Sequence, residues 1–68
     1  MNEDVFNTSI RKFLKTLGVT GQREIEKAVR QALASGKLKG NEKLAAQAVI
    51  TIGTLQFRHE ISETIELG

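Results

Sequence analysis

The sequence predicts an α+β domain in which two N-terminal helices pack on a C-terminal antiparallel β-hairpin or three-stranded meander. Three observations predict this fold class. Apolar residues recur at helical spacing as far as Leu33, and from Leu44 onward the apolar period changes to two. Gly53-Thr54 then divides the alternating stretch where a two-residue turn fits. At 68 residues the chain is expected to form a single domain over residues 1–68.

The helix around which we expect the rest to be organised spans about residues 21–35. Thr20 is the expected N-cap, because its hydroxyl can accept a hydrogen bond from the first turn. Gly36 suits the left-handed position that ends a helix. The i, i+3, i+4, i+7, i+8 pattern of one helical face is formed by Ile25, Ala28, Val29, Ala32 and Leu33.

A first helix is predicted over about residues 3–17, with Asn2 or Asp4 as its N-cap. Gly18 is expected to end it, so that a sharp helical corner separates the two helices. The apolar face of this helix is formed by Phe6, Ile10, Phe13, Leu14 and Leu17.

Two strands are predicted over about residues 44–52 and 55–61. Gly53 is at the first central position of a type II′ turn, where φ is positive. This turn would pair Ile52 with Leu55, Ile50 with Phe57, Ala48 with His59 and Ala46 with Ile61. A short third strand over residues 64–67 is a further expectation, although a two-residue turn at Ser62-Glu63 would put Ile65 and Leu67 on the polar face.

The helices are expected to cover one face of the sheet. The core predicted from this arrangement comprises Phe6, Ile10, Phe13, Leu14, Leu17, Ile25, Val29, Leu33, Ile50, Ile52, Leu55 and Phe57.

Composition and charge narrow the classes of partner and compartment. The chain has no Cys, which excludes disulfides and Cys-based metal sites and fits a cytoplasmic protein. No apolar run is long enough to span a membrane, and the acidic start is unlike a signal peptide.

Charge is distributed unevenly along the chain. Residues 1–43 hold nine Lys and Arg against five Asp and Glu, whereas residues 44–68 hold one Arg against three Glu. The basic helical half therefore allows an anionic partner without requiring one.

The candidate residues for an anionic partner lie in both predicted helices. Arg23, Lys27 and Arg30 are spaced i, i+4, i+7 and form a basic stripe, and a second cluster consists of Arg11, Lys12 and Lys15. Such residues contact phosphates in nucleic-acid-binding proteins. Glu24 and Glu26 interrupt the stripe, so an ordinary solvated helix face is the interpretation we favour.

Two further interpretations have less support. Helix, tight turn and helix followed by a hairpin suggest a winged helix-turn-helix, but Leu14 is too bulky for the usual close approach and a third helix is lacking. His59, the single His, is expected on the apolar face of the hairpin as a partly buried or edge structural residue. It lacks a partner for general-base chemistry.

Several stretches of the chain resemble a small bacterial, mostly proteobacterial, family of unknown function. They include residues 1–6, 11–14, 22–28 and 32–38, with Gly40-Asn41-Glu42, His59-Glu60 and Ile65-Glu66-Leu67. The resemblance covers nearly the whole chain and implies no activity, so no functional residue can be transferred. It does imply a turn at Ser62-Glu63, which favours the third strand.

The function expected from these observations is a small, non-enzymatic interaction module that binds a protein partner. The alternative is a nucleic-acid-binding domain that uses Arg23, Lys27 and Arg30. No catalytic, cofactor-binding or metal-binding residue is predicted. A monomer is slightly favoured over a weak homodimer formed through the edges of the sheet.

Overall fold

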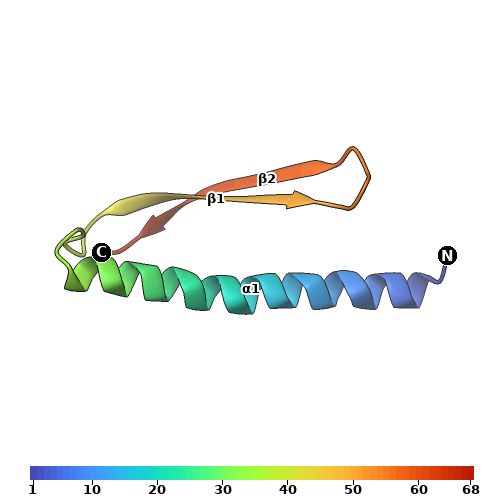
Figure 1. Cartoon of the computed structure of the whole chain (residues 1–68), viewed down its shortest axis with the longest axis horizontal. Helices are drawn as coiled ribbons and strands as arrows, with labels where there is room; N and C mark the ends of the chain where they lie inside the picture. The colour runs from blue at the N-terminus through green and yellow to red at the C-terminus, as the bar shows by residue number, and fades with distance from the viewer. The chain divides into compact units, whose positions relative to one another are not determined.

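The computed structural model describes all 68 residues and contains one helix and one hairpin, shown in Figure 1. The helix α1 spans Glu3–Ala34, and the strands β1 and β2 span Lys43–Thr51 and Arg58–Glu66. The chain divides into two compact units, Met1–Lys37 and Leu38–Gly68, and each is described by itself. The predicted α+β class is confirmed at this level.

The prediction of two helices with a corner between them is wrong, because α1 continues through Gly18-Val19-Thr20-Gly21 without a break. Neither Gly18 nor Gly21 adopts the positive φ with which a glycine ends a helix. The Thr20 hydroxyl caps nothing and instead donates to the carbonyl oxygen of Thr16 at 2.6 Å, one turn earlier. The helical hairpin, and with it the helix-turn-helix interpretation, is therefore excluded.

Both ends of α1 have the capping residues that the sequence suggested. The Asn2 side chain accepts a hydrogen bond from the backbone N–H of Val5 at 3.1 Å, so Asn2 rather than Asp4 is the N-cap. At the other end Gly36 has a φ of 81°. The N–H of Lys37 bonds to the carbonyl of Ala32 and that of Gly36 to the carbonyl of Leu33, which is the Schellman arrangement.

The turn predicted at Gly53-Thr54 is present. Gly53 has a φ of 44°, and the N–H of Leu55 bonds to the carbonyl of Ile52 at 3.0 Å. Thr54 does not have a positive φ, which agrees with type II′ and not with type I′.

The predicted register, however, is wrong by two residues. Thr51 pairs with Arg58, Ile50 with His59 and Ala48 with Ile61, so residues 52–57 all belong to the connection. A shift of two keeps every side chain on its predicted face, because the side-chain period of a strand is two. It also brings the end of the chain into the ladder, where Leu44 pairs with Ile65 and Lys43 with Glu66.

The third strand over residues 64–67 is not formed. Ser62 and Glu63 lie inside β2 and pair with Gln47 and Ala46, so they make no turn. By continuing straight, β2 keeps Ile65 on the same face as Ile61. A turn at Ser62-Glu63 would have put Ile65 on the polar face.

Neither unit buries a side chain by itself, so the predicted core depends on packing between them and remains a prediction. All three Phe are at least 43% exposed, and of the twelve predicted core residues only Val29 and Ile50 are half-buried. A single helix cannot cover its own apolar face, and a two-stranded hairpin has only one layer. The predicted packing of the helical segment on the sheet remains a prediction.

The unbroken helix predicts that Gly18→Ala stabilises the protein. Alanine in a helix interior is favoured over glycine by about 1 kcal/mol, and a Cβ at Gly18 meets no atom within 4 Å. If Gly18 ended a helix in the left-handed conformation, the same substitution would destabilise it. Thermal unfolding followed by circular dichroism distinguishes the two, with Gly36→Ala as the control that should lower the melting temperature.

Gly53→Val is expected to lower the free energy of unfolding by about 1–3 kcal/mol, because valine at a positive φ is strained. Thr54→Ala should have a much smaller effect, since Thr54 has an ordinary φ. Denaturant unfolding of both variants checks this, and equal losses of stability would contradict the type II′ assignment.

Candidate interaction surfaces

One side of α1 carries an apolar stripe that follows the whole helix. At 100° per residue, its members lie within an arc of about 120° around the helix axis. The Leu17 and Ile25 side chains are 40% and 45% exposed, and Gly21 lies between them. We define the apolar stripe as Phe6, Ile10, Phe13, Leu14, Leu17, Gly21, Ile25, Ala28 and Ala32.

The unbroken helix also brings five of the six candidate basic residues onto one side. They lie roughly opposite the apolar stripe and extend over about 27 Å of helix, at 1.5 Å per residue. Arg11 is apart from them, close to one edge of the stripe. All six side chains are exposed. We define the basic ridge as Lys12, Lys15, Arg23, Lys27 and Arg30.

The charge of the ridge is moderate. The unit Met1–Lys37 holds seven Lys and Arg against four Asp and Glu, a net charge of +3. Glu26 lies on the same side as the ridge and accepts a hydrogen bond from the Gln22 amide at 3.2 Å. Glu26 forms no ion pair with Arg30, since the one ion pair of the structure joins Arg58 and Glu60 in β2.

The two faces of the hairpin differ in polarity. On one face Lys43 lies opposite Glu66, and Glu60 accepts hydrogen bonds from Arg58 at 2.7 Å and Gln47 at 3.5 Å. The other face is mainly apolar, with His59 and Glu63 as its polar members. We define the hairpin apolar face as Leu44, Ala46, Ala48, Ile50, Ile61 and Ile65.

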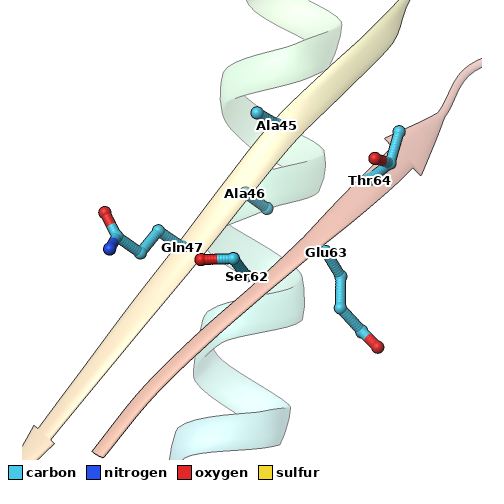
Figure 2. Close-up of a pocket in the computed structure, with 6 residues that line it drawn as sticks. All are labelled: Ala45, Ala46, Gln47, Ser62, Glu63 and Thr64. Carbon is cyan, nitrogen blue, oxygen red and sulfur yellow. The ribbon is translucent and has the colours of Figure 1, made fainter.

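A shallow hollow of about 440 Å³ lies along the middle of the hairpin, lined by Ala45, Ala46, Gln47, Ser62, Glu63 and Thr64. It arises because alanine, serine and threonine are small. Figure 2 shows that the Gln47 and Glu63 side chains point away from each other, so no polar groups converge on a common point. The hollow therefore lacks the convergent polar groups that position a small molecule or a substrate.

The remaining residues with possible chemistry do not form a cluster. His59 pairs with Ile50, so the predicted pairing with Ala48 is wrong, and its side chain is exposed, as an edge residue would be. No group of three or more His, Asp or Glu is placed to hold a metal ion. Although α1 is long, it has no apolar segment of the kind that crosses a membrane.

The carboxylate of Glu42, just before β1, closes the loop that leads into this strand. It accepts hydrogen bonds from the backbone N–H groups of Lys39, at 2.8 Å and 3.1 Å, and of Gly40, at 2.9 Å. These donors stabilise the charged form and lower the pKa of Glu42 from its ordinary value. The shift is explained by a loop that the carboxylate closes, so it does not indicate a catalytic group. Nothing in the sequence analysis had singled out Glu42 for this role.

The whole chain matches a known protein family. Residues 1–68 match the family described as "Family of unknown function (DUF6494)", and because the match covers the whole chain, the protein belongs to this family. The resemblance to a family of unknown function is thereby confirmed. Neither the curated proteins nor the solved structures contain a match.

Acid should weaken the loop that Glu42 closes. Because the folded-state pKa of Glu42 is lowered, its stabilising contribution is complete above the unfolded-state pKa and is lost as the pH falls through the folded-state pKa. We expect Glu42→Gln to reduce this acid-side dependence, measured as melting temperature against pH. Glu63→Gln is the matched control, since its carboxylate makes no hydrogen bond to the backbone, and it should leave the dependence unchanged. Equal pH profiles for wild type and Glu42→Gln would contradict the role of this carboxylate.

Proposed function

We propose that this member of the DUF6494 family is a small, non-enzymatic interaction module whose partner is a protein. The observation that supports the proposal is the apolar stripe: a helix of 32 residues exposes Phe6, Ile10, Phe13, Leu14 and Leu17 in one row. Contiguous apolar patches are rare on monomeric proteins and mark interaction sites. An amphipathic helix that places its apolar side in a partner's groove is a recurring mode of recognition.

The free energy gained by burying the apolar stripe also supports binding to a protein partner. Burying apolar surface is worth roughly 25 cal/mol per Å², so each large side chain of the stripe adds about 1.5–3 kcal/mol when fully covered. An isolated helix is only marginally stable in water and is normally held by the packing of its apolar face. In this proposal the partner supplies that packing.

The second candidate function is nucleic-acid binding through the basic ridge. The continuous helix supports this function better than two separate helices would, because Lys12 and Lys15 continue the row of Arg23, Lys27 and Arg30. Lys and Arg side chains are the groups that neutralise phosphates in nucleic-acid complexes. Glu26 within the row and a net charge of +3 on this unit limit the attraction, so we rank it second.

The proposal also includes the cellular compartment of the protein and its source organism. We propose a cytoplasmic location, because the chain has no Cys and so gains nothing from an oxidising compartment. A bacterial source follows from the resemblance described above and guides the choice of lysate for the experiment.

Two variants of the protein, with substitutions on opposite sides of α1, test the proposal. The apolar variant combines Leu17→Gln and Ile25→Gln, since glutamine has good helix propensity but cannot replace the lost apolar contact. The ridge variant combines Arg23→Glu, Lys27→Glu and Arg30→Glu. Each tagged protein is used for capture from native bacterial lysate, after circular dichroism has confirmed its helix content.

We expect a protein partner that the wild type and the ridge variant retain and the apolar variant loses. Direct titration of the purified partner should show an affinity at least about tenfold weaker for the apolar variant, equivalent to about 1.4 kcal/mol. A different outcome is that the wild type captures nucleic acid, the ridge variant does not, and this binding weakens steeply as salt is added. That outcome would contradict the proposal and support the second candidate function.

A further inference from the structure

We propose that the apolar stripe pairs with the apolar stripe of a second copy of this chain, with the two α1 helices antiparallel. The inference rests on the proposed function and names the partner. It replaces the weak sheet-edge dimer considered from the sequence, because the surface with the most exposed large apolar side chains is on the helix.

The spacing of the stripe is the first argument. Apart from Leu14, its positions 6, 10, 13, 17, 21, 25, 28 and 32 are separated by steps of 4, 3, 4, 4, 4, 3 and 4, which read the same in both directions. In an antiparallel pair centred on Val19, each of these positions therefore meets another of them. The contact is also symmetric, as a twofold dimer of identical chains requires.

The sizes of the side chains select the antiparallel arrangement. Across the symmetric pair, Phe6 faces Ala32, Ile10 faces Ala28, Leu17 faces Gly21 and Phe13 faces Ile25. In three of these four pairs a large residue meets a small one, whereas Phe13 and Ile25 are both large, so most of the contact fills space at an even helix separation. A parallel pair would place Phe6 on Phe6 and Ala32 on Ala32, so the helices would be forced apart at one end and leave gaps at the other.

The charges agree with this arrangement. The acidic first turn, with Glu3 and Asp4, would lie beside Lys37, which follows the C-terminal end of the partner helix. Antiparallel helix dipoles attract, whereas parallel ones repel. The basic ridge stays on the outer side of the pair. One stripe residue, Leu14, meets a polar position, Glu24, whose methylene groups can still cover it.

Sedimentation equilibrium of the full chain gives the first test. We expect a species of twice 7.5 kDa that dissociates on dilution. A 7.5 kDa species alone at millimolar concentration would overturn the proposal. Higher-order assemblies whose mass does not depend on the stripe variants would overturn it as well.

Cysteine crosslinking tests the orientation, because the natural chain has no Cys. Ile10→Cys and Ala28→Cys are prepared as separate chains, mixed and oxidised, and the products are identified by mass. We expect the mixed 10–28 disulfide. Crosslinks of 10 to 10 and 28 to 28 without the mixed product would show parallel helices, and a dimer with none of the three would exclude the stripe as its interface.

Gly21→Leu provides a test that does not depend on losing helix stability. In the single chain a Cβ at Gly21 meets no atom within 4 Å, and leucine is the better helix former. In the dimer the new side chain would collide with Leu17 of the partner copy. We expect the dissociation constant of the dimer to rise by about tenfold or more while helix content is kept. Gly18→Leu, about 60° around the helix, is the matched control and should have little effect. Equal dimer affinities for the two variants would overturn the assigned register.

The two proposals can fail separately. If the stripe binds only a different protein, the chain sediments as a monomer and the Leu17→Gln, Ile25→Gln variant still loses the captured partner. If the stripe binds no protein at all, the chain is monomeric and this variant retains everything that the wild type retains.

Discussion

The hydrogen-bonded backbone that continues through Gly18-Val19-Thr20-Gly21 is the constraint on which the rest of the structure depends. It joins two short apolar faces into one stripe, because Leu17, Gly21 and Ile25 fall on the same side of a continuous helix. It also unites two basic clusters into one ridge. A corner at Gly18 would have allowed two helices to cover each other, whereas a single straight helix leaves its apolar side to another element or another molecule.

The local signals in the sequence were reliable where only one conformation satisfies them. Gly36 and Gly53 both adopt the positive φ expected from their positions, and Asn2 caps the helix. Gly18 and Thr20 are different, because each residue is compatible with two conformations. A glycine permits a left-handed end without requiring it, and a threonine hydroxyl can either cap a new helix or bond back to the preceding turn, as Thr20 does to Thr16. Local chemistry therefore could not decide between one helix and two.

The hairpin shows a second limit of sequence patterns. Alternation determines the face of each residue but is unchanged by a shift of two, so the predicted faces are right and the predicted partners are wrong. The ladder that forms includes the pairs Leu44 with Ile65 and Lys43 with Glu66, which the shorter predicted strands left out. For the candidate surfaces, exposure of the basic side chains was predictable from their charge. Their alignment in one row was not, since it depends on the unbroken helix.

The lack of a core within either unit connects the fold to the proposed function. A chain of this size without disulfides has little stability beyond what its apolar burial supplies, and neither unit buries a side chain by itself. Binding through the apolar stripe would therefore also stabilise the helix, so that folding and association are linked and depend on concentration. A second copy and a different protein would compete for the same stripe, whereas the basic ridge stays accessible in either complex. Self-association would in this way keep the apolar surface covered until a partner with higher affinity displaces the second copy.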